Sequence, residues 1–216
     1  MHDLVIFDCD GVLVDSEMIA QQVIVDRLAP CGLVLSTRQS ADLFVGGTIQ
    51  SASEEATRLG AELPADWVPE TYSAIFEALR DNTPLIANVV DLLDQLDRRG
   101  LQYCVASNGP LAKMEITLGQ NGLWQRFEGR RWSAHDVGHA KPHPGLFLHA
   151  ARAMNAELEA CIVIEDSASG VKAAAAAGMR CLGFAAHCDG ANLRALGAEV
   201  FHDMADVPAL LAMHGS

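Results

Sequence analysis

Lysine is scarce in this acidic chain, which has only three lysines, Lys113, Lys141 and Lys172, among 216 residues and a formal net charge of −13. Without a basic face a protein cannot neutralise a nucleic-acid backbone, so we expect no nucleic-acid partner. A small phosphorylated substrate is compatible with this charge, because one lysine and a bound cation can reverse the sign of the potential inside a pocket. The charge therefore restricts the partners but not the chemistry.

Long apolar runs are also missing, and no stretch approaches the roughly 18 apolar residues of a membrane span. The run Leu4–Phe7 is followed by Asp8 and Asp10 and has no basic segment before it, so we expect no signal peptide. The six cysteines show neither a CxxC pair nor a zinc-ligand spacing, which predicts small buried hydrophobic residues in a reducing compartment. We therefore expect a cytoplasmic protein without a membrane partner, and a monomer.

Half of the residues are hydrophobic, which is enough for one α/β domain and a small accessory domain. Over most of the chain, short apolar runs typical of buried parallel strands alternate with helical patterns. The predicted strands are Leu4–Phe7, 102–106, 161–164, 181–185 and Glu199–Phe201, and the predicted helices between them are 89–96, 145–154 and 171–177. This alternation predicts an α/β fold with an open, doubly wound parallel sheet.

Residues 16–82 break the alternation, since they contain helical stretches at 18–28, 48–59 and 67–79 but no strand pattern. A crossover between parallel strands needs only one helix, so this segment is too long to be a connection alone. We predict a helical cap over 16–82, inserted into an α/β core formed by 1–15 and 83–216. Such an insertion lies beside the carboxyl ends of the strands, where open α/β sheets bind ligands.

Four polar groups stand beyond the ends of predicted strands or before a helix. They are Asp8-Cys9-Asp10-Gly11, Ser107-Asn108-Gly109, Lys141-Pro142 and Glu165-Asp166-Ser167. Carboxylates at the ends of buried strands are costly unless a cation or hydrogen bonds compensate them. An EF-hand loop is a poor alternative for the first group, because its fifth position is Val12 and offers no oxygen ligand. Together the groups supply a nucleophile, ligands for a hard divalent ion, a hydroxyl and a lysine, which phosphoryl transfer requires.

In this order, the four groups resemble the motifs of the haloacid dehalogenase-like hydrolases. The resemblance covers nearly the whole chain, because the inserted helices match the small cap of that family. Within it, the chain is similar to the β-phosphoglucomutase-like branch of sugar phosphatases and mutases, which includes bacterial phosphatases of sugars and sugar acids such as 6-phosphogluconate. The resemblance implies a Rossmannoid core with a cap, a Mg²⁺ cofactor, and hydrolysis of a small phosphorylated metabolite.

The resemblance also implies roles for the acidic residues. Asp8 would attack phosphorus, and Asp10 would protonate the departing alkoxide and then deprotonate the water that hydrolyses the aspartyl-phosphate. Mg²⁺ would be held by the Asp8 carboxylate, the backbone carbonyl of Asp10 and Asp166. Glu165 would be either a ligand or one water removed from the ion.

The substrate-binding residues implied by the resemblance lie in the core and in a loop of the cap. Ser107 and the backbone of Asn108 would hold phosphoryl oxygens, and Lys141 would neutralise both them and the nucleophile. Gly46 and Gly47 would either let the cap loop approach the substrate or form a turn between two helices. The polar side chains that follow could hydrogen-bond a polyol; they are Thr48, Gln50 and Ser51.

Other activities of the family fit the residues less well. Dehalogenases need no metal and lack the second aspartate, and phosphonoacetaldehyde hydrolases use a cap lysine that residues 16–82 do not contain. β-Phosphoglucomutases have a histidine where this chain has Ala20 and an arginine in the loop that matches 46–51, where this chain has none. A mutase must hold a bisphosphate at both ends, so hydrolysis is favoured unless a cap arginine reaches the pocket. The cap arginines are Arg27, Arg38, Arg58 and Arg80.

A receiver domain of a signalling protein is an alternative from another class, since it also surrounds a phosphorylated aspartate with acids, a hydroxyl, a lysine and Mg²⁺. Its phosphoacceptor follows a middle strand of the sequence, and it has no inserted cap. Asp8 instead follows the first predicted strand, and Asp10 is placed to speed dephosphorylation. These differences favour an enzyme.

Overall fold

The fold is a six-stranded, all-parallel sheet with the strand order β3-β2-β1-β4-β5-β6. The computed structural model describes residues 3–44, 47–186 and 188–212. The strands are β1 (Leu4–Phe7), β2 (Gln102–Ser107), β3 (Arg131–Ser133), β4 (Cys161–Glu165), β5 (Arg180–Phe184) and β6 (Glu199–Phe201). Strand β1 lies between β2 and β4, so the chain order reverses beside it, and such a reversal opens a crevice at the carboxyl ends of the strands. The predicted doubly wound α/β sheet is confirmed.

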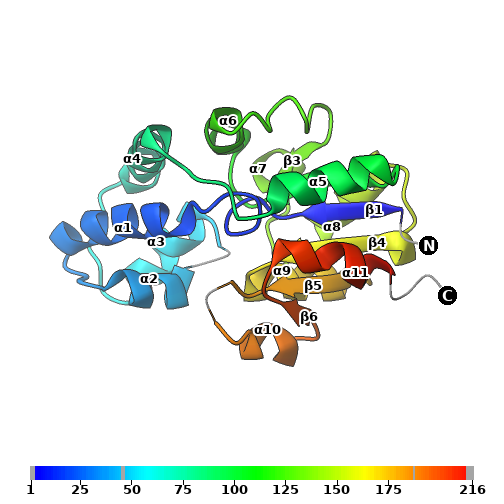
Figure 1. Ribbon diagram of the computed structural model, residues 1–216. Helices are drawn as coiled ribbons and strands as arrows, with labels where there is room; N and C mark the ends of the chain where they lie inside the picture. The colour runs from blue at the N-terminus through cyan, green and yellow to red at the C-terminus, as the bar shows by residue number, and fades with distance from the viewer. Residues whose placement is uncertain (1–2, 45–46, 187, 213–216) are drawn as a thin grey trace.

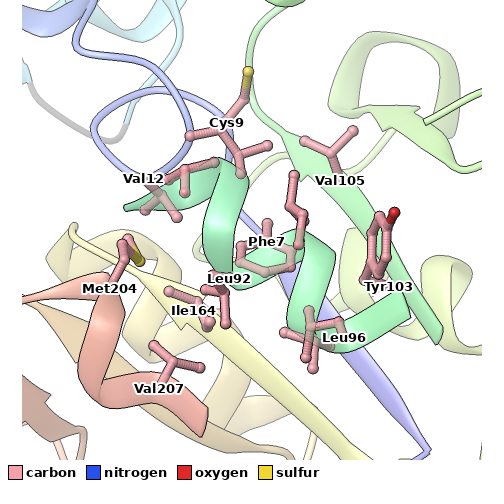
Figure 2. Close-up of a cluster of buried hydrophobic side chains, with 14 of the residues drawn as sticks. Phe7, Cys9, Val12, Leu92, Leu96, Tyr103, Val105, Ile164, Met204 and Val207 are labelled. Atoms are coloured by element: carbon pink, nitrogen blue, oxygen red, sulfur yellow. The ribbon is translucent and has the colours of Figure 1, made fainter. Parts of the chain in front are cut away.

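Both faces of the sheet are covered by helices, which explains why its strands read as continuous apolar runs. In β1, Val5 and Phe7 pack into one cluster with α5 (Val89–Arg98) and α11 (Val207–Ala212). Figure 2 shows Phe7 in this cluster with Leu92 of α5 and Val207 of α11. Leu4 and Ile6 point to the opposite cluster, formed with α8 (Gly145–Ala153) and α9 (Ala168–Ala176). The remaining helices of this part are α6 (Leu111–Gln120), α7 (Ala134–Val137), α10 (Ala191–Ala195) and the 3-10 turns Leu158–Ala160 and Met204–Asp206.

A group of four helices follows β1 and lies beyond the carboxyl ends of the strands (Figure 1). These are α1 (Glu17–Leu28), α2 (Thr37–Phe44), α3 (Ile49–Arg58) and α4 (Trp67–Asp81), with a 3-10 turn at Ala29–Cys31. They share a hydrophobic cluster that includes Leu28, Trp67 and Leu79. The two connections to the sheet run side by side, because the N–H of Asp15 donates to the carbonyl of Pro84 at 2.8 Å. We propose that residues 16–82 form the cap domain expected from the sequence.

Three details differ from the sequence predictions. β3 was not predicted, because its three residues lie at the sheet edge and only Ser133 is buried. The sequence predictions also missed five helices, which are α2, α6, α7, α10 and α11. Four of the six free cysteines are buried as expected, whereas Cys31 is half-buried and Cys188 is exposed. None of the described helices has the length and apolar composition that a membrane span needs.

Candidate active site

The tight turn after β1 brings the first predicted motif against the end of β4. Gly11 has a φ of +75°, which favours glycine, and a Cβ at this position would lie 2.0 Å from Oδ2 of Asp166. The turn closes on itself, because the N–H of Leu13 donates to the carbonyl of Cys9 at 2.9 Å. Absence of a side chain at Gly11 therefore lets the loop that carries Asp8 approach the acidic end of β4.

Lys141 forms the centre of the site. Its Nζ lies 2.5 Å from Oδ1 of Asp8 and 2.6 Å from Oε1 of Glu165, and its side chain is only 2% exposed. Burial alone would lower the pKa of Lys141, but the two carboxylates raise it above the ordinary lysine value. The side-chain amide of Asn108 fixes the backbone here, since its Oδ1 accepts from the N–H of Lys141 at 2.8 Å and its Nδ2 donates to the Lys141 carbonyl at 3.2 Å.

Three predicted metal ligands come together, because oxygens of Asp8, Glu165 and Asp166 lie within 4.8 Å of one another. Burial raises the pKa of Asp8 to about 7, an effect that Lys141 opposes and Glu165 reinforces. Burial also raises the pKa of Asp166, with further increases from neighbouring carboxylates. Clustered carboxylates that are costly to ionise alone fit a hard divalent cation, which prefers oxygen ligands.

Glu165 is already held by several partners, although its role as direct or indirect metal ligand stays a prediction. One oxygen pairs with Lys141, and the other accepts from the N–H of Ser167 at 3.1 Å and from its hydroxyl at 2.8 Å. Gly170 on α9 permits this arrangement, because a Cβ there would lie 1.8 Å from Cδ of Glu165. The first turn of α9 therefore packs directly on this carboxylate.

Asp10 has a partner that the sequence analysis missed. Nζ of Lys113 lies 2.7 Å from Oδ1 of Asp10, and the same oxygen accepts a short hydrogen bond from the hydroxyl of Ser16. Burial would raise the pKa of Asp10, but Lys113 and Ser16 outweigh it and hold the pKa below the ordinary aspartate value. The rarity of lysine and the position of Lys113 six residues after Ser107 were the signals available in the sequence.

Ser107 and Asn108 end β2 beside these acids, and both are buried. The Ser107 hydroxyl accepts from the N–H of Gly109 at 3.0 Å and lines the same pocket as Asp8. The structure therefore brings together the predicted core residues, which come from the ends of β1, β2 and β4 and from the loop before α8.

The pocket extends from the strand ends to helices α1, α2, α3 and α4. Gly47 and Thr48 line it, as predicted for the cap loop, whereas Gly46 lies outside the described residues. Gln50 and Ser51 are not among the described lining residues, which corrects the expectation that they face a polyol. Both are used locally: Gln50 donates to Glu54 at 3.0 Å, and Ser51 completes a capping box with Thr48 at the start of α3.

None of the four arginines of the helical group lines the pocket in the described part of the chain. Arg27 pairs with Glu70 at 3.2 Å, and Arg58 pairs with Glu55. Arg38 and Arg80 are exposed. These arginines therefore do not provide the cationic contact in the pocket that a second phosphate group would need.

Comparison with known proteins gives consistent matches over most of the chain. The model of the family described as haloacid dehalogenase-like hydrolase matches residues 2–178. The 6-phosphogluconate phosphatase of Escherichia coli (strain K12) is 32% identical over 186 residues, covering 85% of this chain and 83% of the relative. Hexitol phosphatase B of the same strain is 27% identical over 178 residues, covering 81% of this chain and 80% of the relative. A solved haloacid dehalogenase-like protein of unknown function from Agrobacterium tumefaciens has a TM-score of 0.85 and 32% identity, with 100% of both chains covered.

Proposed function

Because the chain belongs to the haloacid dehalogenase-like hydrolases, in their sugar-phosphatase branch, we propose that it hydrolyses a sugar or sugar-acid monophosphate through an aspartyl-phosphate on Asp8. The observation that carries this proposal is the pairing of Asp8 with the buried Lys141, at 2.5 Å, beside Glu165 and Asp166. A cation and a cluster of oxygen ligands surround one carboxylate at the end of β1, where it faces a pocket. This arrangement suits a nucleophile that must approach an anionic substrate.

In the first step an oxygen of Asp8 attacks phosphorus, and the bond between phosphorus and the ester oxygen breaks. Asp10 gives its proton to the departing alkoxide, so a neutral alcohol leaves. In the second step water attacks phosphorus, its proton goes to Asp10, and the phosphorus–Asp8 bond breaks to release inorganic phosphate. Mg²⁺, held by Asp8, Asp166, the Asp10 carbonyl and Glu165 directly or through water, would neutralise charge between nucleophile and phosphate.

The ion pair between Asp10 and Lys113 suits the second step better than the first. An ionised Asp10 is ready to accept a proton from water, whereas the first step needs a protonated acid. A phosphate dianion in the pocket raises the proton affinity of a neighbouring carboxylate, and this opposes the effect of Lys113. We propose that substrate binding itself brings Asp10 to its acidic form.

Hydrolysis is preferred to a mutase reaction because the helical side of the pocket offers no described cation for a second phosphate. A mutase has to hold a bisphosphate intermediate in two orientations, and each requires cationic contacts at both ends. Water is then the acceptor of the phosphoryl group. The cytoplasmic location and the monomeric state remain predictions from the sequence.

The decisive experiment is phosphate release from a panel of sugar and sugar-acid phosphates with Mg²⁺, for the native enzyme and for Asp8→Asn. We expect turnover by the native enzyme and a loss of at least about 10³-fold in the variant, because an amide is a poor nucleophile. Full activity of Asp8→Asn, or no turnover on any phosphomonoester, would refute the proposal. Efficient conversion of β-glucose 1-phosphate to glucose 6-phosphate with a bisphosphate primer would instead indicate a mutase.

A further inference from the structure

The part of the pocket wall that comes from helices α1–α4 carries one charged side chain, and it is an acid. Among the described lining residues from these helices, Glu17 is the only ionisable carboxylate, and no lysine or arginine accompanies it. The helical part of the described lining therefore offers no counter-charge for a second anionic group.

The charges of all the described lining residues also disfavour a second anionic group on the substrate. These described residues include five carboxylates but only two ammonium groups, those of Lys113 and Lys141. Lys141 is paired with Asp8 and Glu165, and Lys113 is paired with Asp10. A carboxylate or second phosphate on the substrate would have to break one of these ion pairs or remain without a counter-charge, and either is costly in a partly buried site.

Glu17 and Gln21 lie one helical turn apart on α1 and both line the pocket. Gln21 is buried, and its Oε1 accepts from the hydroxyl of Ser40 at 2.5 Å, so its Nε2 group is directed elsewhere. Within the described chain, neither that Nε2 group nor the Glu17 carboxylate has a hydrogen-bond partner. A buried amide and an acid thus both line the cavity one helical turn apart, and within the described chain part of their hydrogen-bonding capacity is unused.

A hydroxyl group matches this pair, because it can accept from Gln21 and donate to Glu17 at the same time. A carboxylate can only accept, so it would satisfy Gln21 but meet Glu17 with repulsion. The neighbouring wall is apolar, formed by Ile24, Phe44 and Ile75, and can pack against the C–H groups of a carbon chain. Hydroxyls on a short carbon backbone are the chemistry of a polyol or an uncharged sugar.

We propose that the leaving group is an uncharged polyol or sugar, and that Glu17, together with Gln21, selects it over sugar acids and bisphosphates. This inference rests on the proposed phosphatase function and narrows its substrate class. It assigns Glu17 to specificity rather than to metal binding, since Glu17 is not a member of the acidic cluster of Asp8, Glu165 and Asp166.

A matched pair of substrates tests the inference. Sorbitol 6-phosphate and 6-phosphogluconate have the same carbon chain and differ at the terminal carbon, which bears a hydroxyl in one and a carboxylate in the other. We expect the native enzyme to have a kcat/KM at least about tenfold higher for sorbitol 6-phosphate. Both enzymes are assayed at about pH 8, above the pKa of about 7 to which burial raises Glu17, so that the native side chain is ionised. In Glu17→Gln the carboxylate repulsion is removed, so the ratio should fall about tenfold, mainly through a lower KM for 6-phosphogluconate.

The control is Glu77→Gln, which removes an exposed carboxylate from α4 outside the pocket and should leave the ratio unchanged. Thermal melting of each variant checks that it is folded. A native enzyme that prefers 6-phosphogluconate, or a Glu17→Gln variant that slows both substrates equally, would overturn the inference while leaving the phosphatase proposal intact. If neither compound nor any other phosphomonoester is hydrolysed, the phosphatase proposal itself fails.

Discussion

At the scale of single residues, the site depends on two lysines with different partners. Lys141 connects carboxylates at the ends of β1 and β4, whereas Lys113 comes from the first turn of α6 and holds Asp10. Because both Lys113 and Ser16 contact Oδ1 of Asp10, they set the direction in which its other oxygen points. Lys113 therefore acts on the proposed acid and base without being expected to touch phosphorus.

Replacing Lys113 by methionine should raise the pKa of Asp10, because its main stabilising charge is lost. We expect kcat to fall roughly 10- to 100-fold, and the acidic limb of the pH–kcat profile to move about one unit towards higher pH. Steady-state kinetics between about pH 5 and 9 measures both effects. Lys172→Met is the matched control, since Lys172 is exposed on α9, and an unchanged profile in Lys113→Met would show that the ion pair does not tune Asp10.

At the scale of secondary-structure elements, the close contact of α9 with β4 determines how Glu165 is held. The hydroxyl of Ser167 caps α9 by accepting from the N–H of Gly170 at 3.1 Å, and it also donates to Glu165. The helix can begin this near to the carboxylate only because Gly170 has no side chain. The same contacts therefore fix both the start of α9 and the position of the Glu165 carboxylate.

Gly170→Ala should therefore destabilise the protein by about 1–3 kcal/mol, since the new methyl group would displace Glu165. Gly119→Ala on α6 provides the contrast, because no atom lies within 4 Å of the added Cβ. For Gly119→Ala we expect the free energy of unfolding to increase by about 0.5–1 kcal/mol, because alanine has the better helix propensity. Urea unfolding gives both free energies, and equal changes in the two variants would contradict this account of α9.

At the scale of the whole molecule, the sheet and the four-helix group lie next to each other (Figure 1) and each has its own hydrophobic clusters. Residues of both parts line the pocket. Many carboxylates converge on that pocket from both parts. Their burial makes the free energy of unfolding depend on pH and on bound metal. The sign of this dependence follows from the direction of the pKa shifts.

Without metal, the protein should lose stability as the pH rises from about 4 to about 7. Burial raises the pKa of Asp8 from 3.8 and that of Glu17 from 4.5, each to about 7. Within this window the native state holds protons that the unfolded chain has released, so the free energy of unfolding falls with increasing pH and levels off above it. Urea unfolding in a chelating buffer at about pH 5, 6 and 8 measures the trend.

Mg²⁺ should reverse part of this loss, because it stabilises the ionised carboxylates of the native state. The rise in melting temperature on adding Mg²⁺ should be larger at pH 8 than at pH 5, and Asp8→Asn should reduce both the pH dependence and the effect of Mg²⁺. Metal-free stability that increases between pH 5 and 8 would show that these carboxylates are ionised without cost.

The sequence determined the elements whose signals are local. β1 and β6 were predicted with their observed bounds, and β4 within one residue, because a buried parallel strand is a short apolar run ended by polar residues. The same property located Asp8, Ser107 and Glu165, since the carboxyl ends of parallel strands meet at one edge of the sheet. The family motifs then indicated the reaction class.

Only the tertiary structure decided which side chains meet. The partners of Lys141 are 133 and 24 residues away along the chain, and the pairing of Lys113 with Asp10 joins α6 to the turn after β1. The edge strand β3 was too short to give a periodic signal, and the exclusion of Gln50 and Ser51 from the pocket follows from their local bonds. Residue patterns report periodicity and burial, but long-range contacts depend on how the elements pack. The unused hydrogen-bonding groups of Glu17 and Gln21 among the described residues, on which the proposed substrate class rests, could therefore be found only in the folded chain.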